Sequence, residues 1–464
     1  MTAKKNLKRF FDPRNVAVVG ASATKGRPGR VVIENMRANG YTGNIYPVNP
    51  RGGRLMGLKV YKTIEDLPSG IDLAIVILAA QATPQAVRDC AARKIGSIVL
   101  VAGGFAEVDH AGEDLQEELA RAARETGVRV LGPNTAGHIS PPANFTSSFF
   151  PLGDIPRGGI SYVAQTGNFT GAMMKHIMSA ENYGVARCIG LGNTVDIDET
   201  DVFEYLAADK HTDAIFFYLE SLRRPRDFIE IARQVTPKKP VIMLKGGATP
   251  DGAKAALSHT ASLGSDDRIL DGALRQAGVV RIDEFSHLFL TAKAVAPMPV
   301  PAGNRVGFVS PSGAFIVHIS DLCRQRLNLS FPDLTVKTMD RLKEISPPFI
   351  RLSNPVDIFP SATVHGMEFA YRESMEAVLN DPNVDAVVSI MILTKELGMP
   401  SLDFIPELAA KHPKKPIYIS FSGDHACNEE AKAFLEPRGV PTFPLIEDAF
   451  KALDVLVRAR QSLK

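Results

Sequence analysis

The residues best suited to chemistry in this chain lie in the run Ser258-His259-Thr260-Ala261-Ser262-Leu263-Gly264-Ser265. A neutral imidazole is a nucleophile near neutral pH, because one ring nitrogen attacks while a neighbouring group holds the other. Small hydroxyl residues and a glycine leave the imidazole uncrowded and allow a close backbone approach. The run predicts a loop carrying a reactive histidine, although a lone histidine in a polar loop can also be structural or solvated.

The histidine run is an insertion in one copy of an internal repeat. Five landmarks recur in the same order: Val163–Phe169 with Val309–Phe315, Asn193–Ile197 with Asn354–Ile358, Asp213–Ile215 with Asp385–Val387, Pro237–Val241 with Pro413–Ile417, and Ala277–Val279 with Arg438–Val440. Between the last two landmarks the first copy is longer by roughly 15 residues, a loop-sized difference. A loop added to one copy of a duplicated scaffold is a natural place for function.

A reactive imidazole needs a carboxylate or carbonyl to hold its second nitrogen. Glu220 closes the apolar run 214–219 and is therefore expected at the carboxyl edge of a strand. The matching position in the second copy is Ile392, so this acid also belongs to one copy only. Two alternatives stay open: Glu220 caps a neighbouring helix, or His425, near the equivalent edge of the second copy, is the reactive histidine.

Two further segments are expected to begin helices directly after strands. They are Gln165-Thr166-Gly167 in the first copy and Ser312-Gly313 in the second. Backbone N–H groups at such turns bind phosphate oxygens. Both segments are therefore candidate phosphate sites.

Short β-branched runs alternate with helical stretches along the chain, as in parallel α/β layers. In the first part we expect strands at 16–19, 45–48, 73–78, 97–101 and 128–131. Most end in Gly, Ala, Ser or Asn, at the edge where open α/β sheets bind ligands. Proline-containing connectors at 141–156 and 297–301 then divide the chain into three doubly wound domains, 1–140, 141–298 and 299–464.

Composition limits the possible partners. Lys and Arg total 53 against 51 acidic residues, so no basic excess is present for a nucleic-acid backbone. No apolar run is long enough to span a membrane, and no signal peptide is recognisable. The four cysteines are far apart and form no CxxC pair, which argues against disulfides and a zinc site. We therefore expect a cytoplasmic protein with no metal site, no nucleic-acid partner and no membrane contact.

The glycine-rich turn after the first strand is not a dinucleotide fingerprint. Residues 20–26 do not match G-x-G-x-x-G, and the second strand ends at Asn49 without an acid for a ribose. Lys25, Arg27 and Arg30 follow the turn and are placed either to meet phosphates at a helix N-terminus or to form an ordinary charged surface. A P-loop is absent from the sequence, so no ATP site of that type is expected.

Together these motifs resemble the α subunits of the NDP-forming acyl-CoA synthetases, which are related to succinyl-CoA synthetase. The resemblance covers nearly the whole chain and rests on 18–22, 46–50, Gly132-Pro133-Asn134, Gly192-Asn193, 196–199, 218–220 and 258–263. It implies a Rossmann-like CoA-binding domain followed by two flavodoxin-like doubly wound domains. The chain departs from the family pattern at Ala164 and Thr166 in the phosphate turn, at Thr135 after Asn134, and at Gly264-Ser265-Asp266 after the histidine run. These differences leave the acyl specificity open.

The resemblance also implies roles for individual residues. His259 would be the phosphorylated histidine and Glu220 its orienting carboxylate. Gly20, Ser22, Lys25, Val48, Asn49, Ala79 and Asn134 would bind CoA. Phosphate would bind at Gln165, Thr166, Gly167, Ser312 and Gly313. ATP or ADP, with Mg²⁺, would bind to a separate ATP-grasp β subunit, and a small carboxylic acid, CoA and phosphate would react at this chain.

Two other functions remain as alternatives. A non-catalytic regulator would sense CoA or acyl-CoA and leave His259 idle, but such a protein would not need an intact Ser-His-Thr run. An NAD-linked dehydrogenase is disfavoured by Asn49 and by the missing dinucleotide fingerprint.

Overall fold

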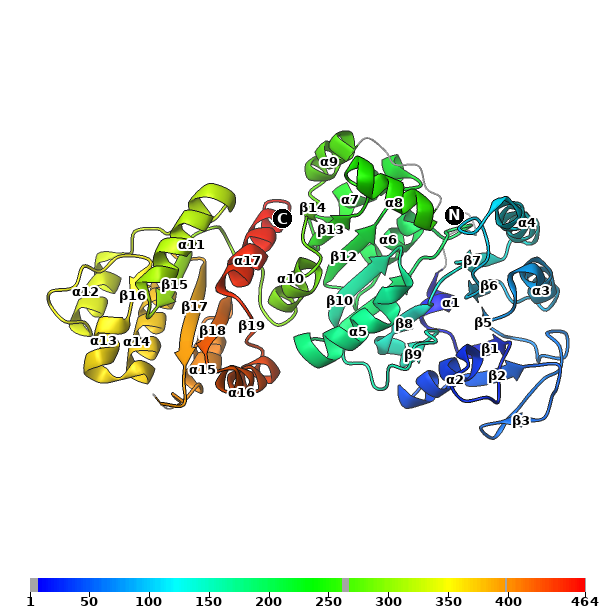
Figure 1. Cartoon of the computed structure of the whole chain (residues 1–464), viewed down its shortest axis with the longest axis horizontal. Helices are drawn as coiled ribbons and strands as arrows, with labels where there is room; N and C mark the ends of the chain where they lie inside the picture. Colours follow the sequence, from blue (N-terminus) through cyan, green and yellow to red (C-terminus); the bar gives the residue numbers. More distant parts are fainter. Residues whose placement is uncertain (1–6, 261–266, 397–398, 464) are drawn as a thin grey trace. The chain divides into compact units, whose positions relative to one another are not determined.

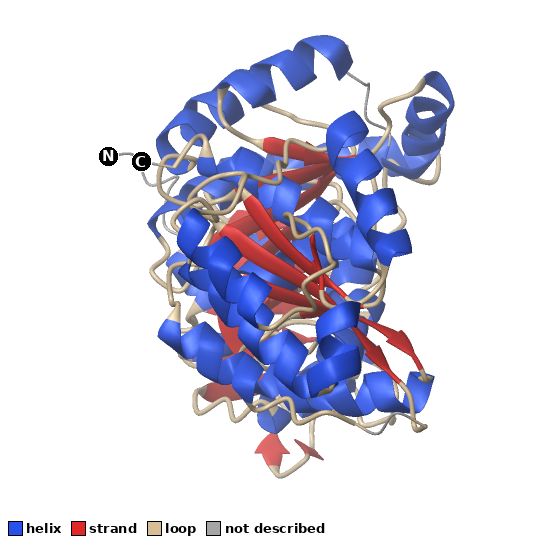
Figure 2. Ribbon diagram, turned by 90° about the vertical axis from the view of Figure 1, so that its left-hand side faces the viewer, coloured by secondary structure: helices blue, strands red, loops and turns tan. Residues whose placement is uncertain are grey.

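The computed structural model describes residues 7–260, 267–396 and 399–463. It contains two compact units, Met1–Asp283 and Glu284–Lys464. In both units the parallel strands of each main sheet run between helices (Figures 1 and 2), which confirms the predicted α/β class. Within the described ranges, no helix combines the length and apolarity needed to cross a bilayer.

The first sheet of unit 1 has the strand order β2-β1-β5-β6-β7, and all of its pairings are parallel. Its strands are β1 (Asn15–Val19), β2 (Asn44–Val48), β5 (Leu73–Val76), β6 (Ser97–Leu100) and β7 (Arg129–Leu131). Its helices are α1 (Lys8–Phe11), α2 (Pro28–Ala38), α3 (Thr83–Ala92) and α4 (His110–Thr126), and β3 (Arg54–Leu55) and β4 (Leu58–Lys59) form a small ribbon. All five strands were predicted, because strands covered on both faces are apolar along their length.

The second sheet of unit 1 has the order β14-β13-β12-β10-β11-β8-β9. The strands are β8 (His138–Ser140), β9 (Phe145–Thr146), β10 (Arg157–Ala164), β11 (Val185–Gly190), β12 (Ala214–Leu219), β13 (Val241–Lys245) and β14 (Val280–Ile282). Its helices are α5 (Ala172–His176), α6 (Glu199–Ala208), α7 (Pro225–Val235), α8 (Pro250–Thr260) and α9 (Asp267–Gln276). Among these described strands, the β11–β8 and β8–β9 pairings are antiparallel and the others are parallel.

Unit 2 contains a sheet of order β16-β15-β17-β18-β19, again parallel. The strands are β15 (Val306–Ser310), β16 (Val356–Asp357), β17 (Ala386–Leu393), β18 (Ile417–Gly423) and β19 (Thr442–Phe443). The helices are α10 (His287–Val295), α11 (Gly313–Arg326), α12 (Val336–Glu344), α13 (Phe359–His365), α14 (Met367–Asn380), α15 (Phe404–Lys411), α16 (His425–Leu435) and α17 (Ile446–Arg460). Leu290 and Ala294 of α10 belong to the hydrophobic core of this unit.

The topology of the two later sheets supports the internal duplication. The order β14-β13-β12-β10-β11 repeats as β19-β18-β17-β15-β16. The pairing registers also agree: Val163 pairs with Phe217 in the first copy, and Val309 pairs with Ser389 in the second. Counting three residues onward from Phe217 and from Ser389 reaches Glu220 and Ile392, so the predicted equivalence of these two positions is confirmed.

One of the five sequence landmarks is not structurally equivalent. In the first copy Val163 pairs with Ile189, whereas in the second Val309 pairs with Val356. Val356 therefore corresponds to Ile189 and not to Val195, six residues later. The reason is that segment 193–197 follows the buried strand β11 as a loop, while the similar segment 354–358 contains the strand β16 itself.

The first two sheets share one hydrophobic core. A single cluster of buried side chains includes Val16 and Ile75 from the first sheet, and Val163 and Phe217 from the second. Burial of this much apolar surface is the main force holding two layers together. The shared core therefore fixes the carboxyl edges of the two sheets relative to each other within unit 1. The predicted domain limits at 140 and 298 stay predictions.

Candidate active site

His259 lies near the end of a helix. The sequence predicted a loop at 258–265, but α8 runs from Pro250 to Thr260 and so includes the first three residues of that run. Pro250 stands at the first helical position, and the strong helix formers Ala253–Leu257 follow it. The side chain of His259 and residues 261–266 lie outside the described residues, so their predicted contacts stay predictions.

Helix α8 begins beside Glu220. A Cβ on Gly246, directly after β13, would lie 3.2 Å from Cγ of Glu220. A Cβ on the next residue, Gly247, would lie 3.5 Å from Cα of Ala253 and from Cβ of Ala256 in α8. His259 follows Ala256 by three residues, slightly less than one helical turn. Two consecutive glycines thus allow α8 to pack near the end of β12, where Glu220 lies.

The backbone at Glu220 is held by Gln165. The side-chain Oε1 of Gln165 accepts hydrogen bonds from the backbone N–H groups of Glu220 at 2.7 Å and Ser221 at 2.9 Å. Its Nε2 donates to the carbonyl of Ser221 at 3.1 Å. Gln165 is 6% exposed, so these bonds are shielded from water. Its side chain therefore positions the acid-bearing segment.

The carboxylate and carbonyl of Glu220 have further neighbours. The Tyr218 hydroxyl donates to Oε1 of Glu220 at 3.3 Å, and Nζ of Lys245 donates to the Glu220 carbonyl at 2.7 Å. Burial, followed by the nearby Glu220 charge, raises the pKa of Tyr218. Burial lowers the pKa of Lys245. Glu220 therefore has a neutral hydroxyl donor at its carboxylate and the Lys245 side chain as a donor at its carbonyl.

The phosphate turn of the first copy begins a short 3₁₀ turn and not an α-helix. Residues Gly167–Thr170 form this turn, and Oγ1 of Thr166 accepts from the backbone N–H of Asn168 at 3.3 Å. A four-residue turn has little macrodipole, so any phosphate affinity here would come from individual N–H groups. By contrast, Ser312 is the N-cap and Gly313 the first residue of α11, a full α-helix in unit 2.

A pocket of about 180 Å³ brings several predicted residues together. Asn134, after β7, lines it together with the turn residues Gln165, Thr166 and Gly167. Nδ2 of Asn134 donates to Oδ1 of Asn193, another lining residue, at 3.3 Å. The pocket therefore joins the carboxyl edge of the first sheet to that of the second.

The other predicted CoA-binding residues follow strands of the first sheet. Gly20 has φ +88°, and a Cβ there would lie 2.0 Å from the carbonyl oxygen of Ile77. Only glycine fits this turn, which leads to α2. The backbone N–H of Gly20 donates to the Val48 carbonyl at 3.1 Å, and Nδ2 of Asn49 donates to the Ala21 carbonyl at 2.8 Å. Val48 and Asn49 therefore fix the shape of the turn.

The remaining residues of this edge are more accessible. Lys25 and Ala79 are exposed, and Ser22 is half-buried with its Oγ accepting from the Thr24 N–H at 3.2 Å. Arg30, for which both a phosphate contact and an ordinary surface charge were considered, donates to the Ala23 carbonyl at 2.7 Å and pairs with Glu34. Its side chain thus stabilises the loop, while Lys25 remains exposed beyond it.

Comparison with known proteins identifies both parts of unit 1. A family model described as a CoA binding domain matches residues 14–141, and one described as a succinyl-CoA ligase like flavodoxin domain matches residues 157–295. The α subunit of acetate–CoA ligase (ADP-forming) II from Pyrococcus furiosus is 32% identical over 461 residues, which cover 98% of each chain. The chain belongs to the ADP-forming acetate–CoA ligase family.

Further relatives agree with this assignment. Acetate–CoA ligase (ADP-forming) II from Archaeoglobus fulgidus is 34% identical over 97% of this chain, which spans 66% of that relative's length. A solved structure of acetyl-coenzyme A synthetase 1 from Ca. Korarchaeum cryptofilum, in complex with phosphate and ADP, has a TM-score of 0.90 and 30% identity, covering 99% of this chain and 98% of that one. The resemblance and the fold class predicted from the sequence are confirmed. The relatives give no support to the non-catalytic alternative.

Sequence reasoning missed several residues of the pocket. Phe149, Phe150 and Thr135 line it, and none of them was predicted to bind a ligand. Phe149 and Phe150 lie in the connector between the predicted domains, where no motif marks them. Asn193 carried a signal, because Gly192-Asn193 is part of the family resemblance. It also donates to Oε2 of Glu107 at 2.6 Å, which fixes its amide.

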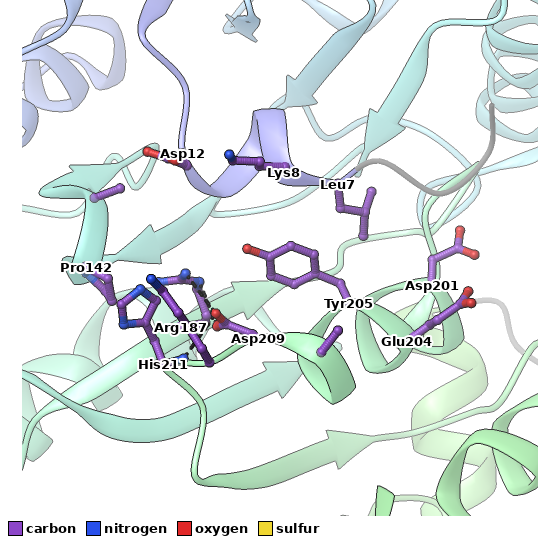
Figure 3. A pocket seen from close by; sticks show the side chains of 13 residues that line it. Leu7, Lys8, Asp12, Pro142, Arg187, Asp201, Glu204, Tyr205, Asp209 and His211 are labelled. Atoms are coloured by element: carbon purple, nitrogen blue, oxygen red, sulfur yellow. Dashed lines mark hydrogen bonds and ion pairs between the residues drawn. The ribbon is translucent and has the colours of Figure 1, made fainter. Parts of the chain in front are cut away.

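A larger pocket of about 550 Å³ shares no residue with the predicted site (Figure 3). Its wall includes Arg187, whose Nε lies 3.3 Å from Oδ2 of Asp209; both side chains are at least 95% buried. The ring of Tyr205 stacks on Phe11 with 4.4 Å between centroids. Since Asp209 already neutralises Arg187, this guanidinium is a structural group and not an anion site.

Proposed function

We propose that this chain is the α subunit of an ADP-forming acyl-CoA synthetase. The complex interconverts a carboxylate, CoA and ATP with acyl-CoA, ADP and phosphate. One observation carries the proposal: Glu220, held by Gln165, lies beside the Gly246-Gly247 turn that leads into the helix bearing His259. This acid and this helix occur in one copy of a duplicated fold. Family membership and the CoA-binding domain support the same activity.

The reaction is described most simply in the direction that consumes acyl-CoA. An oxygen of inorganic phosphate attacks the thioester carbonyl, the C–S bond breaks, and CoA leaves as a thiolate that takes a proton from solvent. One ring nitrogen of His259 attacks the phosphorus of the acyl phosphate, the P–O bond to the acyl group breaks, and the carboxylate leaves. An oxygen of ADP then attacks the phosphorus and breaks the N–P bond, which restores the imidazole.

The residues of this chain have separate roles in these steps. Glu220 holds the second ring N–H of His259 and stabilises the positive charge of the phosphorylated ring. Backbone N–H groups at Thr166 and Gly167 bind the phosphate in the pocket beside Asn134. CoA binds along the carboxyl edge of the first sheet, with Gly20, Val48 and Asn49 shaping the turn. Ser22, Lys25 and Ala79 are its more accessible contacts.

The nucleotide, as its Mg²⁺ complex, binds to a separate ATP-grasp β subunit. The Pyrococcus furiosus relative, matched along 98% of its length, is itself named a subunit alpha. The longer Archaeoglobus fulgidus relative contains a further third that this chain does not match. Ser312 and Gly313 in unit 2 are a second phosphate site at the start of α11. We place the complex in the cytoplasm, because all four cysteines are free thiols.

Reconstitution tests this function. The full chain is co-purified with an ATP-grasp partner and assayed for acyl-CoA formation from ATP, CoA and a panel of carboxylic acids. We expect turnover from the complex, ADP as the product, and no turnover from either chain alone. Thioester formation without ATP, or a complex that is inactive with every acid of the panel, would refute the proposal.

A further inference from the structure

The pocket beside the phosphate turn is uncharged throughout its described lining. Besides Asn134, Asn193 and the turn residues, it is lined by Val101, Thr135, Ala136, Gly192, Phe149 and Phe150. The last two rings are stacked, with centroids 4.9 Å apart and an angle of 23° between the ring planes. The lining of the pocket therefore combines an aromatic wall with the phosphate turn.

The aromatic wall is held in place by buried contacts. Nδ2 of Asn35 donates to the carbonyl oxygens of Ser148 at 2.8 Å and Phe150 at 2.6 Å, and Asn35 is 3% exposed. A Cβ on Gly171 would lie 2.6 Å from Cδ2 of Phe150. Only a glycine at 171 leaves room for this ring. The wall is thus held by contacts within the protein itself, which reduces the entropy lost on binding.

The size and polarity of the pocket favour one kind of acyl group. A cavity of about 150 Å³ lined by apolar side chains accommodates benzene, and this pocket measures about 180 Å³. An aromatic ring gains from packing on other rings beyond the area that it buries. A second carboxylate would lose its hydration here without meeting a cation among the lining residues, which is costly.

We propose that Phe149 and Phe150 bind the acyl tail and select monocarboxylic acids with an aromatic side chain over dicarboxylic acids and acetate. The inference rests on the proposed function, because the phosphate turn must hold the reacting end of the acid. The rings then contact the tail at the other end of the same pocket.

Binding of thioesters to the full chain tests this proposal without the partner subunit. Isothermal titration compares CoA, phenylacetyl-CoA, acetyl-CoA and succinyl-CoA. We expect phenylacetyl-CoA to bind at least about 10-fold more tightly than acetyl-CoA or succinyl-CoA. Phe150→Ala should remove most of this preference and leave the Kd of CoA unchanged. Phe349→Ala is the matched control, since Phe349 is 80% exposed in unit 2.

Two further variants keep the test decisive. Phe150→Leu keeps the apolar volume if Phe150→Ala fails to fold, and it should lose part of the preference. The chain contains no tryptophan, so Phe149→Trp would introduce its single indole. Phenylacetyl-CoA should change the tryptophan emission, and succinyl-CoA should not. Equal binding of succinyl-CoA, or an unchanged preference in Phe150→Leu while CoA still binds, would overturn the proposal. Failure of CoA itself to bind would instead refute the proposed function.

Discussion

The side-chain carbonyl of Gln165 accepts two hydrogen bonds, from the backbone N–H groups of Glu220 and Ser221, at 2.7 and 2.9 Å. Gln165 follows β10 and Glu220 follows β12, the neighbouring strand. The amide therefore links the phosphate turn to the acid-bearing segment. A displacement of one would be transmitted to the other.

Replacing Gln165 by leucine should affect catalysis more than binding. Two buried N–H groups would lose their acceptor, at a cost of about 1–3 kcal/mol each. A shift of about 1 Å in the Glu220 backbone reduces turnover by about 100-fold. Steady-state kinetics of the complex should show a lower kcat with little change in KM for CoA. Gln234→Leu, at an exposed glutamine of α7, should change neither; an unchanged kcat in Gln165→Leu would rule out the positioning role.

The buried ion pair in the larger pocket should contribute to stability and not to activity. Removing Arg187 leaves Asp209 with its charge buried, and breaking such a pair costs about 3–5 kcal/mol. Urea unfolding of Arg187→Met should show this loss in the free energy of unfolding. Arg341→Met is the comparison, because the Arg341–Glu373 pair is partly exposed and should cost less than about 1 kcal/mol. Equal losses in both variants would contradict the prediction.

The carboxyl group of Glu199 should make the protein less stable as pH rises. Burial, with the charge of Asp198 as a second cause, raises its pKa from 4.5 to about 7. Below pH 4.5 the group is protonated in both the folded and the unfolded chain. Between pH 4.5 and 7 only the unfolded chain releases its proton, so the free energy of unfolding falls by up to about 3 kcal/mol.

Glu199→Gln removes this proton release. Its melting temperature should match that of the wild type near pH 4.5 and exceed it above pH 7. Thermal unfolding at pH 5 and pH 8 measures the difference. Glu230→Gln, at an exposed glutamate of α7, should follow the wild type at both pH values. A Glu199→Gln variant that loses stability at pH 8 would show that the carboxylate is needed in its charged form.

Much of the scaffold could be predicted from the sequence, because buried parallel strands leave an unambiguous apolar signal. The strands of the first sheet and the equivalence of Glu220 with Ile392 follow from that signal. Contacts between segments distant in sequence could not be predicted in this way. Phe149 and Phe150 line the pocket because Asn35 binds the backbone of the connector and Gly171 leaves room for the Phe150 ring. Nothing near residue 150 in the sequence indicates these contacts.

Local patterns were misleading at the start of the histidine run. The serines, threonine and glycine of 258–265 indicated a loop, yet the alanine-rich residues before them extend α8 to Thr260. Residues 261–265 lie outside the part of the chain that the structure describes. Similarly, segments 193–197 and 354–358 look alike but occupy different places in their sheets. Residue similarity alone does not determine which backbone groups pair.

The central claim concerns transfer of a phosphoryl group to His259. The complex of this chain with its ATP-grasp partner is incubated with γ-labelled ATP, and the labelled chain is digested to locate the modified residue. We predict acid-labile, base-stable label on His259, its loss in His259→Ala together with turnover, and slower labelling in Glu220→Gln. His425→Ala, at the exposed first residue of α16 in the second copy, should label normally. Undiminished turnover by His259→Ala, or label retained in that variant, would contradict the account.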